Sequence, residues 1–201
     1  MGTARGRVEK RPAGYPSEYE SVVGLSDGRK VRICPIVPSD APELAEAIRT
    51  ADSETLRARF LGAPPPLTDA VLARLTEVDY VTRFALIAHS KGRGVAIARY
   101  AAEQPAEDGS VTAEVAVAVA PEWRRVGLAT VLIEELGRRA LECGITNFSA
   151  LYSAGNRPVA ELARQGSARV VIDDGAAQLD ALLGSPHDDW PRVEGRGRDT
   201  S

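Results

Sequence analysis

The chain has 201 residues, of which 44% are hydrophobic and 26% are charged, and its formal net charge is −3. This length and composition are typical of one soluble globular domain, and the negative charge argues against nucleic acid as the main partner, because a phosphate backbone binds a basic surface. No apolar run is as long as a membrane span and no secretory signal pattern is present, so a cytoplasmic protein without membrane contact is expected. The two cysteines, Cys34 and Cys143, lie far apart without metal-ligand spacing, and no metal site is expected.

The two ends of the chain differ in composition from its middle. Residues 1–21 and 185–201 are rich in Gly, Pro and charged residues and show no hydrophobic periodicity, which is typical of flexible tails. Residues 22–184 contain no internal repeat or low-complexity linker. The sequence therefore predicts one folded domain over residues 22–184 with a tail at each end.

The first half of this domain predicts one strand followed by helices. Residues 30–37 alternate as a strand does, and Pro35 indicates an edge position or the end of the strand. Helices are expected at residues 39–51, 53–61 and 68–78. Asp40 and Glu43 are spaced as a capping box for the first of these helices, and Thr68 is the expected N-cap of the third.

The second half of the domain predicts most of a sheet. Strands are expected at residues 83–89, 94–103 and 112–120, and the short turns between them predict an antiparallel meander. The elements expected next are a helix at 127–143, a strand at 148–153, a helix at 156–165, a strand at 168–172 and a helical turn at 178–183. This order indicates an α+β fold in which a mixed central sheet carries helices on both faces.

The segment from Ala113 to Thr130 carries the clearest functional signal. Its strand is apolar on both faces, and Glu114 stands at the head of a row of alanines on one of them. A helix begins directly after the strand, and backbone N–H groups at a helix N-terminus are unpaired and attract anions. Gly127 lets the backbone approach such an anion, and Arg124 and Arg125 add positive charge. The segment therefore predicts a site for a phosphate-bearing ligand.

These residues resemble the signature of the GCN5-related N-acetyltransferases (GNAT family), which is Q/R-x-x-G-x-G/A after the fourth strand. Arg124, Gly127 and Ala129 match it, and the order of elements agrees with the family over residues 30–172. The resemblance implies a GNAT-like, mixed and mostly antiparallel sheet whose fourth and fifth strands splay apart around acetyl-CoA, the acyl donor. It assigns the pyrophosphate to the helix start and the pantetheine arm to the strand. The cofactor-binding residues that it implies are Val117, Val119, Arg124, Arg125, Val126, Gly127, Leu128, Ala129 and Thr130.

A second family feature follows the fifth strand. The family has an Asn there, which Asn156, ahead of Val159, matches, and the resemblance implies that both contact the CoA arm. Family members often carry a Tyr in the next helix that protonates the leaving thiolate, followed by a Gly-aromatic pair. Residues 162–167 instead read Leu-Ala-Arg-Gln-Gly-Ser. Tyr152 is the candidate replacement for this acid, and its alternative role is that of a packed aromatic side chain.

Glu114 also gains a role from the resemblance. Several family members place a catalytic glutamate at the start of the fourth strand, where it deprotonates the acceptor amine. Such a base is required because a protonated amine has no free lone pair to attack the thioester. The alternative is a solvated glutamate at a strand end.

The resemblance implies an N-acetyltransferase that transfers acetyl directly from acetyl-CoA to an amine. Residues 56–79 are also similar to the acetyltransferase domain of bacterial protein-lysine acetyltransferases, which makes a protein lysine the first expected acceptor. The alternatives are a small amine of the polyamine or aminoglycoside type, and a non-catalytic acetyl-CoA-binding regulatory module. The sequence leaves the oligomeric state open, with a homodimer as one option.

Overall fold

One mixed sheet forms the centre of the molecule. The computed structural model describes residues 11–52, 66–165, 168–173 and 175–184. Within these ranges the strands are β1 (Ser21–Gly24), β2 (Lys30–Pro35), β3 (Arg83–Ser90), β4 (Arg93–Ala102), β5 (Thr112–Val119), β6 (Asn147–Ser153), β7 (Arg169–Asp173) and β8 (Ala176–Leu182). They are ordered β1-β2-β3-β4-β5-β6-β8-β7, and every neighbouring pair is antiparallel except the parallel pair β5 and β6. The predicted α+β class with a mixed, mostly antiparallel sheet is confirmed.

The helices lie where the sequence periodicity predicts them, as far as the chain is described. They are α1 (Ala41–Thr50), α3 (Asp69–Thr76), α4 (Leu128–Glu142) and α5 (Arg157–Gln165). Thr68 caps α3 as expected, because its Oγ1 accepts the backbone N–H of Val71 at 3.3 Å. The helix expected at residues 53–61, and with it most of the segment that resembles protein-lysine acetyltransferases, lies outside the described residues. None of the helices in the described ranges is long and apolar enough to cross a bilayer.

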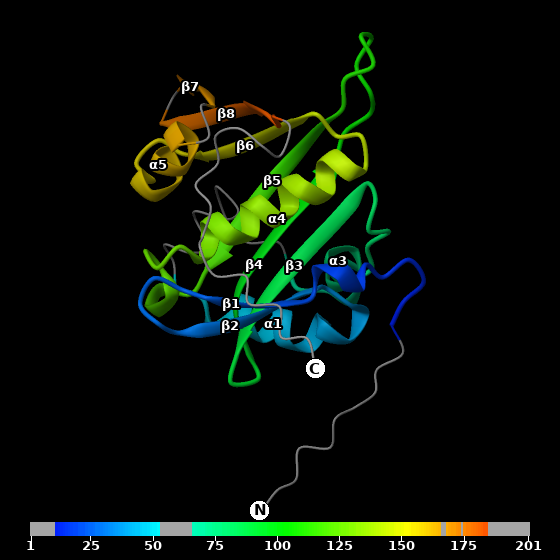
Figure 1. Ribbon diagram of the computed structural model, residues 1–201, viewed down its shortest axis with the longest axis vertical. Helices are drawn as coiled ribbons and strands as arrows, with labels where there is room; N and C mark the ends of the chain where they lie inside the picture. The colour runs from blue at the N-terminus through cyan, green and yellow to red at the C-terminus, as the bar shows by residue number, and fades with distance from the viewer. Residues whose placement is uncertain (1–10, 53–65, 166–167, 174, 185–201) are drawn as a thin grey trace, which may run out of the picture.

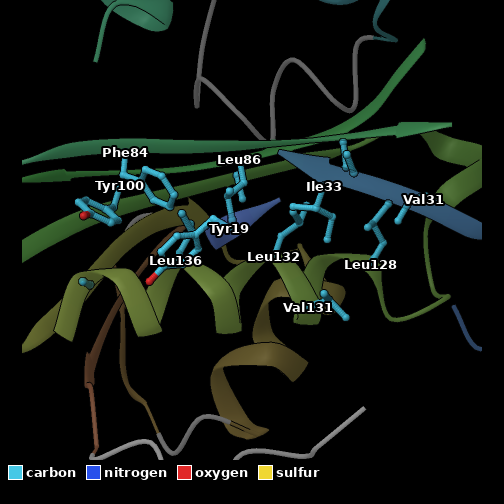
Figure 2. Close-up of a cluster of buried hydrophobic side chains, with 14 of the residues drawn as sticks. Tyr19, Val31, Ile33, Phe84, Leu86, Tyr100, Leu128, Val131, Leu132 and Leu136 are labelled. Atoms are coloured by element: carbon cyan, nitrogen blue, oxygen red, sulfur yellow. The ribbon is translucent and has the colours of Figure 1, made fainter. Parts of the chain in front are cut away.

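Helix α4 covers one face of the sheet (Figure 1) and contributes five of the 21 buried residues of the main core cluster in the described part of the chain. Figure 2 shows its side chains Leu128, Leu132 and Leu136 pointing at the strands, where they meet Ile33, Leu86, Phe84 and Tyr100. All of these side chains are almost completely buried. A smaller cluster on the opposite face joins Ile36, Ala85 and Ile87 to Leu44 of α1, so the sheet has helices on both faces. β5 lies between β4 and β6 in this sheet, and its valines pack against the main core.

The folded part of the chain begins before residue 22, contrary to the predicted tail boundary. A short 3-10 turn, Ser17–Tyr19, leads into β1, and Tyr19 is only 2% exposed. The Tyr19 ring packs edge-on against Phe84 and lies under the Arg138 guanidinium, and its hydroxyl donates to Glu142 Oε2 at 2.8 Å. Burial and this hydrogen bond raise the pKa of Tyr19. A single aromatic residue among charged ones gives no periodic signal, which is why the pattern missed it.

Tyr19→Phe tests whether this N-terminal segment is part of the domain. The ring would still pack, but the Glu142 carboxylate would lose a hydrogen bond, and such a loss costs about 1–2 kcal/mol. We therefore expect the free energy of unfolding in urea to fall by about that amount, with the m-value unchanged. Tyr15→Phe is the matched control. The Tyr15 hydroxyl also donates to a carboxylate, that of Glu20, but the Tyr15 ring is less buried. An unchanged midpoint for Tyr19→Phe would contradict the anchoring role.

Two local predictions are wrong. Residues 178–183 do not form a helical turn. Residues 178–182 belong to β8, because pairing with β6 and β7 on both sides outweighs the helix propensity of this short run. The Asp40–Glu43 capping box is absent too. Asp40 accepts the Val37 backbone N–H at 2.8 Å, and Glu43 reaches across to the backbone N–H of Gly94. Glu43 thus ties α1 to the β3–β4 hairpin instead of closing its own helix.

Candidate active site

Strands β5 and β6 separate after a short parallel ladder. Their paired residues are Thr112 with Asn147, Ala113 with Phe148 and Glu114 with Ser149, and no pair follows Glu114 in the described ladder. β5 nevertheless continues to Val119, paired with β4 along its whole length. The two strands therefore diverge from Glu114 onward. Beyond that residue, no described strand pairs with the edge of β5 that faces away from β4.

The alternation of backbone hydrogen bonds along β5 identifies which of its N–H and C=O groups face this divergence. Thr112 O accepts from Glu103 N, and Ala120 N donates to Val95 O, both in the register that pairs β5 with β4. In an antiparallel pair, alternate residues point their N–H and C=O groups at the partner. The even-numbered residues of β5 therefore bond to β4, and Val117 and Val119 direct their backbone groups toward the divergence. The Val119 carbonyl accepts Arg124 Nε at 3.2 Å.

The side chains of β5 alternate as the sequence predicts. Val115, Val117 and Val119 pack against the main core beneath α4. Glu114 belongs to the opposite face and is exposed at the last paired position before the strands diverge. No described residue forms a hydrogen bond or ion pair with its carboxylate. The carboxylate is thus open to an incoming group at the mouth of the divergence.

Arg99 of β4 is a candidate site residue that no sequence motif indicates. It pairs with Ala116, while Glu114 pairs with Ala101, so Arg99 and Glu114 lie on the same face of neighbouring strands, one row apart. Side chains in such diagonal positions are close enough for long residues to interact. The signal in the sequence is an arginine in the middle of a strand whose only other charged residue is Arg93 at its start.

The loop between β5 and α4 has the backbone shape of an anion site. Arg125 and Gly127 both have positive φ, +59° and +85°, so the chain turns sharply before the helix. Gly127 is the N-cap and no side chain caps the helix, whose first internal hydrogen bond runs from Val131 N to Gly127 O. The N–H groups of Leu128 to Thr130 therefore point out of the helix end, as an anion requires.

The same loop is anchored from the β1–β2 hairpin. Arg29 stacks on the Trp123 ring at 3.9 Å and donates to the Glu122 carbonyl at 2.9 Å. Ser26 N donates to Val126 O at 3.3 Å. Arg124 donates to Val119 O at the end of β5 through its Nε and lies 3.7 Å from the Asp52 carboxylate. The loop that precedes α4 is thus held both by the β1–β2 hairpin and by β5.

The predicted site residues that follow α4 in the sequence, Tyr152, Asn156 and Val159, lie on the β6 side of the divergence. Asn156 caps α5, because its Oδ1 accepts Val159 N at 3.3 Å. Tyr152 is 4% exposed on β6. Continuing the offset that pairs Glu114 with Ser149 places Tyr152 opposite Val117 across the divergence. Val117 and Tyr152 thus form the two walls at the same level.

A second cluster of reactive side chains lies away from this site. Cys34 Sγ is 3.6 Å from His89 Nδ1, and His89 Nε2 is 3.4 Å from Glu43 Oε2. Burial raises the pKa of the Cys34 thiol to about 11, so the thiol stays protonated near neutral pH. The cluster fastens α1 to β2 and β3 and is not an activated nucleophile. Among the described residues there is also no group of side chains able to hold a metal ion.

Comparison with known proteins assigns the family. The family model "Acetyltransferase (GNAT) family" matches residues 47–166. The chain belongs to the GNAT acetyltransferase family. It is 34% identical over 145 residues to Acetyltransferase PA5475 of Pseudomonas aeruginosa, a match that covers 70% of this chain and 76% of that protein. The GNAT protein described here is accordingly an N-acetyltransferase with acetyl-CoA as its acyl donor.

Solved structures agree with the fold of this GNAT protein. The GNAT domain of S. lividans PAT is 28% identical and superposes with a TM-score of 0.74, covering 84% of this chain and 99% of that chain. The structure of yncA from Salmonella typhimurium with its cofactor acetyl-CoA is 18% identical, with a TM-score of 0.63 and coverage of 77% and 95%. The second likeness concerns the fold alone.

Proposed function

We propose that acetyl-CoA lies along β5, with its pyrophosphate on the N–H groups at the start of α4 and its pantetheine arm beside Val117 and Val119. The observation that carries this proposal is the combination of two sets of outward-facing backbone groups at one place, on β5 and at the helix N-terminus. A pantetheine arm contains amide groups that bond to a strand edge as another strand would. Asn156 and Val159, at the start of α5, would bound the arm on the β6 side.

The chemistry follows from this placement. Glu114 takes a proton from the acceptor ammonium, and the free lone pair attacks the thioester carbon. The Val117 N–H stabilises the oxyanion that develops there. The C–N bond forms in this attack, and the C–S bond breaks as the carbonyl re-forms. Tyr152 donates its hydroxyl proton to the leaving thiolate, and the nitrogen releases its second proton, which restores the Tyr152 hydroxyl through water. Glu114 on the open side and Tyr152 on the buried side would thus handle the two proton transfers separately.

Tyr152→Phe tests the second of these transfers. A thiolate is a modest base, so water can replace the phenol, and we expect kcat to fall by only about tenfold. The dissociation constant for acetyl-CoA should stay unchanged, because the ring remains in place. Initial-rate kinetics with release of free thiol measure the first quantity, and calorimetry measures the second. A kcat equal to that of the unmodified enzyme would leave Tyr152 as a packed aromatic side chain.

A protein lysine is the acceptor that we propose. Two features support it: the likeness of this chain to the GNAT domain of S. lividans PAT over nearly the whole of that domain, and the exposure of Glu114. An exposed base is accessible to a lysine side chain presented by a folded protein. The test is acetylation of a panel of proteins set against polyamines and aminoglycosides, with thiol release as readout. Preferential turnover of the small amines would contradict the lysine assignment.

A further inference from the structure

Exposed apolar side chains gather at one end of the sheet. Of the seven large hydrophobic residues that are exposed in the described part of the chain, five lie on β6, β7 and β8: Leu151, Val170, Val171, Ile172 and Leu182. Figure 1 shows β7 at the outer end of the sheet beyond β8. All five residues of β7 are exposed, and no described strand pairs with its outer edge. An edge strand of this kind is a template for pairing with another chain.

The hydrogen bonds around β8 determine which groups of β7 face outward. Leu183 N donates to Thr146 O, and Ala154 N donates to Gly175 O, both in the register that pairs β6 with β8. The odd-numbered residues of β8 therefore bond to β6, and its even-numbered residues bond to β7. Gln178 consequently exchanges hydrogen bonds with Val171. Val170 and Ile172 are left with their backbone N–H and C=O groups on the outer edge.

The sequence of β7 is complementary to itself in the antiparallel direction. It reads Arg169-Val170-Val171-Ile172-Asp173. When two copies pair antiparallel about Val171, Arg169 of each lies opposite Asp173 of the other. The same register sets Val170 opposite Ile172, which are the two residues whose backbone groups face outward. The opposite charges, the apolar side chains and the outward-facing backbone groups thus all favour the same antiparallel register.

We propose that a second copy of this chain pairs with the outer edge of β7, antiparallel and centred on Val171. Four backbone hydrogen bonds would join Val170 and Ile172 of the two copies, and two Arg169–Asp173 pairs would flank them. Leu151 lies in the same row as Val171, across Gln178, and extends the apolar surface on that face. The sheets of the two copies would become continuous. This proposal does not depend on the acyl-transfer chemistry.

Val170→Pro tests the backbone pairing. Proline at this position removes an N–H group that faces outward, and it leaves the hydrogen bonds between β7 and β8 intact. Proline is tolerated at such places on edge strands. The matched control is Val22→Pro on β1, the other edge of the sheet. Val22 is 66% exposed, and its N–H also faces outward, because Leu25 N bonds to Arg29 O in the β1–β2 register.

At about 100 µM, a chain that dimerises with a micromolar dissociation constant is almost entirely dimeric. Sedimentation analysis of the full chain at this concentration therefore measures whether the dimer forms. We expect a dimer for the unmodified chain and for Val22→Pro, and a monomer for Val170→Pro with unchanged far-UV circular dichroism. A monomeric unmodified chain, or a dimer that Val170→Pro leaves intact, would overturn the proposal.

Charge reversal tests the register. Arg169→Asp and Asp173→Arg each set like charges opposite one another, so each variant should dimerise about tenfold more weakly. The double variant restores both opposite-charge pairs and should recover the original dissociation constant. A mixture of the two single variants should also form heterodimers more tightly than either variant pairs with itself. Equal affinities across these four samples would contradict pairing about Val171.

Discussion

Replacing Glu114 with Gln is expected to lower kcat by about 10²- to 10⁴-fold, the usual contribution of a general base. Gln keeps the shape and hydrogen-bonding capacity of the side chain but cannot accept the ammonium proton. Because Glu114 lies on the face of β5 opposite the core valines, acetyl-CoA affinity should stay within about twofold of the original. Thiol release under saturating acetyl-CoA measures the first quantity, and calorimetry measures the second. Glu18→Gln, an equally exposed glutamate in the first 3-10 turn, is the control for the loss of one negative charge.

The pH profile of the Gln variant separates a lost base from a disturbed structure. If Glu114 removes the ammonium proton, the variant depends on the small fraction of acceptor that is already neutral. A lysine amine has a pKa of about 10.4, so this fraction, and the rate with it, should rise about tenfold per pH unit above neutrality. A variant that is slow at every pH, or one with full turnover at pH 7 to 8, would remove Glu114 from this role.

Gly127→Ala is expected to raise the dissociation constant for acetyl-CoA by about 10- to 100-fold, which corresponds to losing one or two hydrogen bonds to a charged phosphate. Gly127 has φ of +85°, and a Cβ added there meets no atom within 4 Å. The new methyl group would therefore lie in open space at the start of α4, where we place the pyrophosphate. The kcat at saturating acetyl-CoA should change much less than the dissociation constant.

The matched control for this variant lies at the other end of the same helix. Gly144 also has positive φ, +78°, and open space around its missing Cβ. Both alanine variants should lose about 1–2 kcal/mol of unfolding free energy, because a left-handed conformation is unfavourable for alanine. Only Gly127→Ala should weaken acetyl-CoA binding. Equal weakening by Gly144→Ala would mean that the effect comes from general strain in α4.

Much of the fold could be predicted from local patterns. The alternation of residues 112–120, the apolar stripe of α4 and the Thr68 cap are short-range signals, and the structure has these elements where the sequence indicates them. The failures arise where distant contacts decide. β8 is a strand because β6 and β7 pair with it on both sides. Tyr19 is in the core because α4 reaches it through Arg138 and Glu142, residues more than a hundred positions away.

The candidate site was predictable in its parts and not in its geometry. The Gly127 motif and the Glu114 position are visible in one stretch of sequence, but the divergence of β5 from β6 depends on a ladder between residues 35 positions apart. The contacts of Arg124 could not be predicted for a similar reason. Its side chain is held by Val119 O and lies near Asp52, neither of which a motif can indicate. No motif indicates Arg99, because an arginine within a strand becomes informative only when the register sets it beside Glu114.

A crystal structure with acetyl-CoA bound would show the proposed cofactor position. We expect the pyrophosphate on the N–H groups of Leu128 to Thr130 and the pantetheine amides on the backbone of Val117 and Val119. We expect the thioester between Val117 and Tyr152, with Glu114 facing its open side. A cofactor that leaves the β5–β6 divergence empty, or whose pyrophosphate lies away from the start of α4, would contradict this proposal.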